Sequence, residues 1–174
     1  MTLIFKNDVA LASVRNQLFI SGEINMDLFD WMFIVSGFIF FVSMISAILL
    51  MARNKMKTVK VFGPILAVLM LPIIAVLINY IVFSKDLRFV IFTILILIYL
   101  MAESLLDMVF KIDFRSKPST HVPYIIVEWA AAFSFLFGTI RLDTTIGWII
   151  AIFFWTFIIA LVYYIIKRRK NNEK

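Results

Sequence analysis

The chain has no cysteine and a single histidine among its 174 residues. The missing thiols exclude disulfides, thiolate metal sites, a cysteine nucleophile and S-palmitoylation. A zinc site would need His121 together with carboxylates from other segments. The serine-hydrolase elbow, the H-E-x-x-H helix, the P-loop and the dinucleotide-binding fingerprint are also missing. We therefore predict no metal site and no cofactor, and the sequence identifies no catalytic residue.

Charged residues are also scarce, at 16% of the chain, whereas an ordinary soluble domain has about a quarter. Hydrophobic residues make up 63% of the chain, and the mean hydropathy is +1.01. So few polar groups cannot cover a soluble surface, and the excess apolar surface must face lipid. The apolar runs are long and uninterrupted, which indicates helices that close their own backbone hydrogen bonds rather than a barrel. The predicted fold class is an all-α integral membrane protein.

Five apolar segments are long enough to cross a membrane. We expect one transmembrane domain over residues 26–167, with these spans: 28–51, 61–83, 87–112, 122–140 and 146–166. Residues 1–25 carry apolar residues near helical spacing, which predicts a short amphipathic helix lying in the interface on the extracytoplasmic side. Residues 168–174 form a basic cytoplasmic tail.

Two features inside these spans predict local geometry. Pro72 lies in the middle of the second span and should kink that helix. Ala130, Ser134 and Gly138 in the fourth span form a ridge of small residues, which is typical of close packing between membrane helices. Asp30 lies at the start of the first span, where we expect an interfacial charge at a helix N-terminus.

The 17 Lys and Arg residues are divided unequally between the two sides of the five-span arrangement. Twelve fall on the side of the C-terminus, and the other side has Lys6, Arg15, Lys85, Arg88 and Arg141. Because cytoplasmic loops carry the excess of basic residues, we predict a multi-pass protein of the cell membrane with its N-terminus outside and its C-terminus in the cytoplasm.

The same excess of basic residues gives the chain a formal net charge of +6. We expect the basic residues to contact anionic lipid head groups at the cytoplasmic face. The chain shows no basic face with interleaved aromatic residues outside the spans, so nucleic acid is not an expected partner. A homo-oligomer is a further expectation, because five helices in one chain enclose only a narrow pocket.

The charged residues that cost the most free energy inside a membrane lie between Tyr99 and Glu128. Glu103, Asp107 and Lys111 are four residues apart and form one stripe on a helix. The connection to Glu128 is short, so the third and fourth spans should be antiparallel neighbours whose carboxyl groups converge at similar depth in the inner leaflet. The candidates for this polar pocket are Glu103, Asp107, Lys111, Glu128 and Tyr99. The candidates for its rim are Asp113, Arg115, Lys117, His121 and Tyr124.

Several functions fit such a group of residues. Carboxyl groups inside a membrane suit a site for a small cation, an amine or a proton-coupled solute. Basic residues at the rim suit an enzyme or binder that acts on the head group of a lipid or an isoprenoid. A structural subunit is the third function class, and local pairing, such as Asp107 with Lys111, would explain the charges without any ligand.

Overall fold

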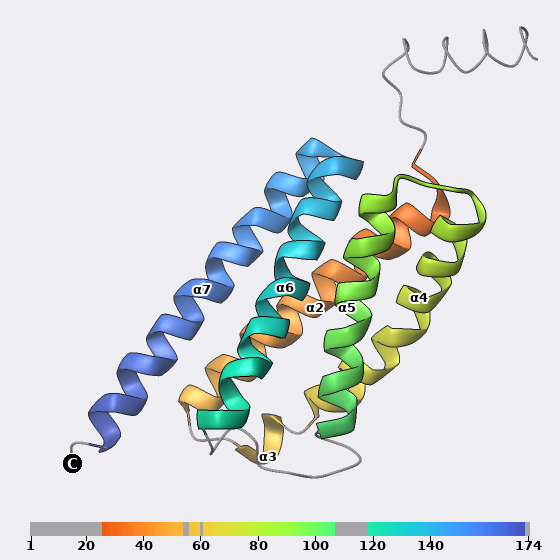
Figure 1. Cartoon of the computed structure of the whole chain (residues 1–174). Helices are drawn as coiled ribbons and strands as arrows, with labels where there is room; N and C mark the ends of the chain where they lie inside the picture. The colour runs from red at the N-terminus through yellow and green to blue at the C-terminus, as the bar shows by residue number, and fades with distance from the viewer. Residues whose placement is uncertain (1–25, 54–55, 60, 107–117, 173–174) are drawn as a thin grey trace, which may run out of the picture.

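The computed structural model describes residues 26–53, 56–59, 61–106 and 118–172, and these residues are helical apart from turns and short connections. The helices are α2 (Leu28–Ala52), α3 (Met56–Val59), α4 (Phe62–Val82), α5 (Leu87–Ser104), α6 (Pro118–Leu142) and α7 (Thr144–Asn172). Helices α4, α5, α6 and α7 form an antiparallel row, each packed against the next, and α2 crosses behind that row (Figure 1).

Helix α2 is the centre of the bundle. It packs against α4, α6 and α7, and it is the most buried of the five long helices. Its small residues Ser36, Gly37 and Ser43 are buried and allow the neighbouring helices to approach closely. The bundle has two ends, which are named here by their residues and helices. The Asp30 end contains the start of α2 and the α4–α5 and α6–α7 turns, and the opposite end contains α3 (Figure 1).

The predicted all-helical fold with five helices long and apolar enough to cross a membrane is confirmed. The expected spans correspond to α2, α4, α5, α6 and α7, although α6 begins at Pro118, four residues before the expected start. Helix α4 continues through Pro72. The predicted interfacial helix over residues 1–25 lies outside the described residues.

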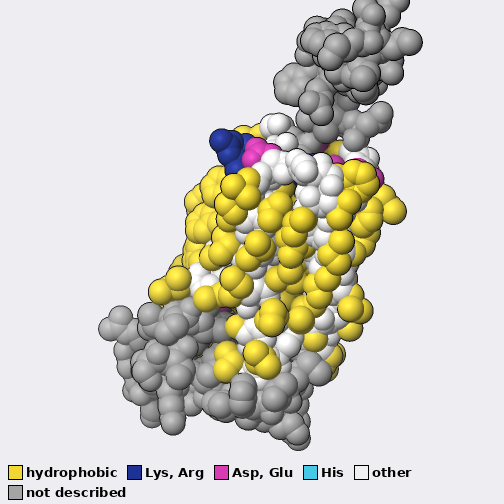
Figure 2. Space-filling view, turned by 45° about the vertical axis from the view of Figure 1, so that its right-hand side comes forward, with side chains coloured by type: hydrophobic (Ala, Val, Ile, Leu, Met, Phe, Trp, Pro, Cys, Tyr) yellow, Lys and Arg dark blue, Asp and Glu magenta, His cyan; other side chains and the backbone are white. Residues whose placement is uncertain are grey.

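The outer surface of the bundle is apolar. Large hydrophobic side chains are exposed on all five long helices, and one face shows them covering the whole length of the bundle, with charged side chains gathered at the Asp30 end (Figure 2). Trp31 and Trp148 are exposed near that end, where aromatic side chains commonly mark a membrane interface. A soluble monomer rarely exposes an apolar surface of this extent, so lipid is the solvent for these side chains.

Within the core, a group of aromatic rings joins α2, α5 and α6. Phe40 of α2 lies 5.1 Å from the ring of Phe135 and 5.5 Å from the ring of Tyr99, measured between centroids. Phe33 lies 5.4 Å from Phe135. All four rings are fully buried. Tilted and edge-on ring pairs at such distances are favourable beyond their area burial, and these pairs tie the two neighbours α5 and α6 to α2.

The ridge of small residues on α6 packs as expected. The ring of Phe33 lies directly against Gly138, where a methyl group would come within 2.6 Å of Phe33 Cζ. Ser134 is buried and turns its hydroxyl to the carbonyl of Ala130 at 2.7 Å. A second close approach occurs at the α6–α7 turn, where a methyl group on Gly147 would lie 2.5 Å from Ile140 Cα.

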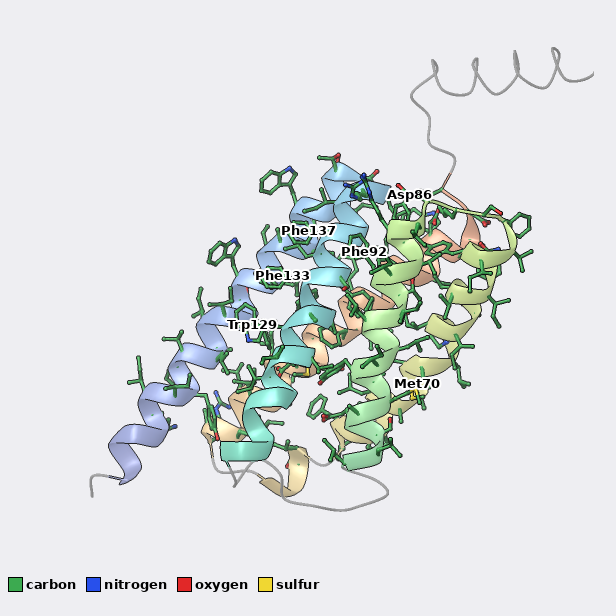
Figure 3. The ribbon with its side chains drawn as sticks, in the orientation of Figure 1. Met70, Asp86, Phe92, Trp129, Phe133 and Phe137 are labelled. Atoms are coloured by element: carbon green, nitrogen blue, oxygen red, sulfur yellow. The ribbon has the colours of Figure 1, made fainter. Side chains whose placement is uncertain are left out.

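A different face of α6 carries three aromatic side chains one turn apart, Trp129, Phe133 and Phe137 (Figure 3). Their rings follow one another at 5.7 Å and 5.9 Å between centroids. Phe154 of α7 lies 5.9 Å from Trp129 and 5.1 Å from Phe133. This aromatic row therefore fixes α7 along the length of α6.

Candidate functional site

Glu103 and Glu128 are both buried in the described part of the chain, with 3% and 8% of their surface exposed. Glu103 lies in the last turn of α5, and Glu128 lies within α6. Tyr99, one helical turn before Glu103, is fully buried. These three residues, which the sequence predicts to line a polar pocket, thus face the interior of the bundle rather than lipid.

The two carboxyl-bearing residues lie at nearly the same depth. Phe92 of α5 and Gly138 of α6 are level with each other, because a methyl group on Gly138 would lie 3.6 Å from Phe92 Cδ2. Glu103 follows Phe92 by about 11 residues and Glu128 precedes Gly138 by about 10, so at about 1.5 Å per residue both lie about 15–17 Å from that contact. Since α5 and α6 pack against each other and run antiparallel, both glutamates lie on the same level of one helix pair.

Helix α2 forms the wall opposite this pair. Tyr99 donates its hydroxyl hydrogen to Met44 Sδ of α2 at 3.3 Å, and Glu103 lies one turn further along the same face of α5. Glu128 lies two turns before Phe135, whose ring contacts Phe40 of α2. Both glutamates therefore belong to the faces that α5 and α6 turn toward α2.

The chain changes geometry directly after Glu103. Leu105 and Leu106 continue α5 in π-helical form, a local geometry that recurs at functional sites. Ser104 donates a hydrogen bond to Met70 Sδ of α4 at 3.5 Å. A sulfur atom is a weak acceptor, so this is a weak hydrogen bond between α5 and α4.

The remaining predicted site residues are not tested by this structure. Five of them lie outside the described residues: Asp107, Lys111, Asp113, Arg115 and Lys117. His121 and Tyr124 lie in the first two turns of α6, where only the backbone is described. The convergence of three carboxyl groups and the basic rim therefore stay predictions. Among the described residues, no three His, Asp or Glu side chains are grouped so that they could hold a metal ion.

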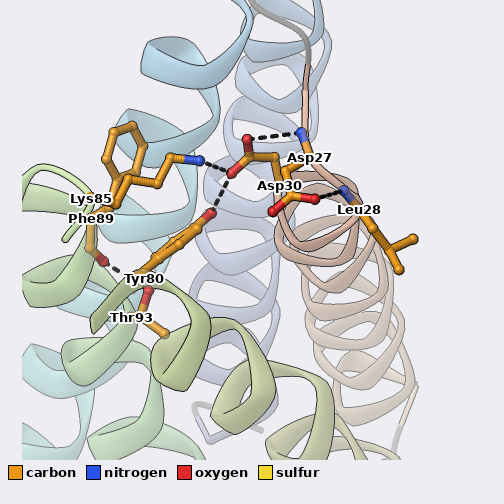
Figure 4. A network of polar contacts seen from close by, with 7 residues as sticks. All are labelled: Asp27, Leu28, Asp30, Tyr80, Lys85, Phe89 and Thr93. Carbon is orange, nitrogen blue, oxygen red and sulfur yellow. Dashed lines mark hydrogen bonds and ion pairs between the residues drawn. The ribbon is translucent and has the colours of Figure 1, made fainter. Parts of the chain in front are cut away.

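A second polar group, not anticipated as a site from the sequence, lies at the Asp30 end (Figure 4). Asp30 of α2 is 2% exposed. Its Oδ1 atom accepts a hydrogen bond from the hydroxyl of Tyr80 at 2.9 Å and forms an ion pair with Lys85 Nζ. Its Oδ2 atom accepts the backbone N–H of Asp27 at 3.3 Å. One buried carboxylate thus joins the start of α2 to the end of α4.

Local sequence explains how Lys85 reaches that carboxylate. Ser84 has a positive φ of 49°, and it follows the last turn of α4 in a Schellman motif. The N–H of Lys85 donates to the carbonyl of Tyr80 at 2.9 Å, and the N–H of Ser84 donates to the carbonyl of Ile81 at 3.1 Å. Asp86 then caps α5 by accepting the N–H of Arg88 at 3.1 Å. The turn therefore folds Lys85 back over the helix that precedes it.

The ammonium group of Lys85 is held by aromatic rings as well as by charge. Its Nζ lies 4.7 Å from the centroid of the Tyr80 ring and 5.5 Å from that of the Phe89 ring. These distances are within the range of cation–π attraction. From its place at the start of the first span, Asp30 was expected to be an interfacial charge. The Asp27-x-x-Asp30 spacing does predict a capped helix start, and a capping box is present, but no local pattern reveals partners 50 and 55 residues away.

Comparisons of the chain with protein-family models, with curated proteins and with solved structures give no match.

Proposed function

We propose that this chain is a multi-pass membrane protein that binds a small cation, an amine or a proton-coupled solute at Glu103 and Glu128. The observation that supports this proposal is the burial of two acidic side chains at one depth on two adjacent antiparallel helices. Ionisable side chains at such positions are costly in a membrane protein, and they commonly belong to ion, proton or substrate paths.

Electrostatics favours a positively charged ligand at this place. Two carboxylates close together in a medium of low dielectric constant repel each other, and a proton or a cation between them removes that repulsion. Carboxylate oxygens are also the ligands that hard cations prefer.

The charge distribution along the sequence supports an orientation for this site. With the N-terminus outside the cell membrane, as the excess of basic residues on the other side favours, α2 starts at the outer face. Glu103 and Glu128 then lie in the cytoplasmic half of the bundle. The basic loops at that face would contact anionic lipid head groups, and a second copy of the chain would be needed to complete a permeation path.

The proposal is tested with the full chain reconstituted in liposomes. Proton entry is followed with a trapped pH-sensitive dye after an imposed pH gradient, and amine entry is followed with radiolabelled methylammonium. We expect uptake of at least one probe above that of empty liposomes. Glu103→Gln and Glu128→Gln should each abolish it, because the neutral amide keeps the side-chain volume but cannot hold a cation or release a proton.

Asp86→Asn is the matched control, since it neutralises an exposed acid at the opposite end of the bundle. It should leave uptake unchanged. Wild-type uptake equal to that of empty liposomes for both probes would refute a transport role, and equal losses in Asp86→Asn and Glu103→Gln would refute the assigned site. Lipid or isoprenoid that co-purifies in a fixed ratio and is lost in Glu128→Gln would support the head-group function instead.

A further inference from the structure

We propose that Asp30, Tyr80 and Phe89 form a recognition site for a primary ammonium group, and that Lys85 is its built-in occupant. The proposal does not depend on the function proposed for Glu103 and Glu128. Glu103 lies in the last turn of α5, and the opposite end of that helix is at the Asp30 end (Figure 1). The ligand class is a small primary ammonium ion that reaches the bundle from the Asp30 end.

The groups around the Lys85 ammonium are those that recognise organic cations. A carboxylate oxygen of Asp30 supplies the counter-charge, and the same oxygen is held by the Tyr80 hydroxyl at 2.9 Å. The rings of Tyr80 and Phe89 lie 5.7 Å apart in an edge-on arrangement, and both are within cation–π distance of Nζ. One anion combined with aromatic faces is the combination found in ammonium-binding sites.

The receptor part of this site is rigid, whereas its occupant lies near the surface. Asp30, Tyr80 and Phe89 are 2%, 0% and 8% exposed and belong to α2, α4 and α5. The Lys85 side chain is 29% exposed and extends from a turn rather than a helix. We expect the packed groups to keep their arrangement when the lysine leaves, because each belongs to a long helix of the bundle, whereas Lys85 belongs to the connection between two of them.

Lys85 is attached to the site through the protein chain, and this attachment determines how much free amine is needed to displace it. A ligand attached by a short flexible chain has an effective concentration on the order of millimolar or above, and a free amine must compete with it. Removal of the lysine side chain should therefore convert an occupied site into an open one. It also leaves the Asp30 carboxylate without the charge partner that the structure shows, so binding of a free ammonium ion should restore stability.

Thermal unfolding of the purified full chain in detergent, followed by tryptophan fluorescence, tests this inference. Lys85→Ala should unfold at a lower temperature than wild type. n-Butylammonium chloride should raise its unfolding temperature along a saturating curve, beyond the effect of equal sodium chloride. Wild type should require a higher amine concentration for the same shift, because Lys85 competes. Arg88→Ala, which removes an exposed cation from the first turn of α5, should behave as wild type.

The double variant Asp30→Asn with Lys85→Ala lacks the counter-charge and should not respond to the amine. A response of that double variant equal to the response of Lys85→Ala would overturn the proposal. Equal amine curves for wild type and Lys85→Ala would overturn it as well, since the amine would then bind elsewhere. If Lys85→Ala does not fold, Lys85→Gln, whose amide retains a donor toward Asp30, is titrated in its place, and no specific response there would also overturn it.

Discussion

Three helical glycines in close contact with neighbouring side chains or backbone allow a graded test of the packing. Replacement of glycine by alanine within a helix contributes about 0.8–1.0 kcal/mol of stability through helix propensity. Forcing a methyl group into a filled space costs about 1–3 kcal/mol. The sign of each substitution therefore depends on what the added methyl group meets, and the structure shows three different neighbours.

At Gly37 the methyl group would lie 3.0 Å from Phe135 Cδ1, which a small shift of the ring relieves. At Gly138 it would lie 2.6 Å from Phe33 Cζ, in a ring that is fully buried among other rings. At Gly147 it would lie 2.5 Å from the Cα atom of Ile140, and backbone of a packed helix cannot rotate away. We expect net effects on the free energy of unfolding of about zero for Gly37→Ala, a loss of about 1–2 kcal/mol for Gly138→Ala, and a loss of about 2 kcal/mol or more for Gly147→Ala.

Titration of dodecyl sulfate into detergent micelles, followed by tryptophan fluorescence, measures the free energies of unfolding of the three variants and wild type. The order of stability, Gly37→Ala above Gly138→Ala above Gly147→Ala, is the result that counts. If Gly147→Ala unfolds at the same dodecyl sulfate fraction as Gly37→Ala, the close approach of α6 and α7 at their turn is not present in the protein in micelles.

Four further substitutions have effects that follow from single contacts, and the same titration measures each. Tyr80→Phe should cost about 1.5–3 kcal/mol, because it removes a hydrogen bond to the buried carboxylate of Asp30; an unchanged midpoint would contradict that bond. Ser84→Gly should stabilise by about 1 kcal/mol, because glycine adopts positive φ without steric cost. Asp143→Ala should cost about 1 kcal/mol, since Asp143 Oδ1 caps α7 by accepting the N–H of Ile146 at 2.8 Å, whereas Asp143→Asn should be nearly neutral. Thr139→Val should stabilise by about 1 kcal/mol, because the hydroxyl is buried without a hydrogen-bond partner among the described residues.

The sequence predicts the helices well because each spanning segment satisfies its own backbone hydrogen bonds. Leu28, for example, is both the expected and the observed first residue of its helix. The cap of α7 is harder to predict, since Asp143, Thr144 and Thr145 are all residue types that cap helices and Asp143 performs this role. That choice depends on the local backbone path, which composition does not determine.

The candidate sites could be predicted from the sequence less completely than the helices. Glu103 and Glu128 are buried on adjacent helices, and their similar depth could be predicted because depth along a helix follows from residue number. That they line a pocket stays a prediction. The group around Asp30 was missed because it depends on one non-local fact and on one local backbone conformation. One is the tilt of α2 across α4, and the other is the left-handed Ser84, which turns Lys85 back over Tyr80. Neither leaves a periodic trace in the sequence.

The central place of α2 has a consequence for biogenesis. This helix is the first of the five to be synthesised and therefore the first to reach the bilayer, yet its finished surroundings include α7, the last to emerge. Its face with Phe38 and Phe41, whose rings contact Phe153 and Phe154 of α7, must remain covered by lipid or by a chaperone of the insertion machinery until translation is nearly complete. A ribosome stalled before α7 would hold an unfinished bundle, and we expect such nascent chains to be degraded far faster than the released protein.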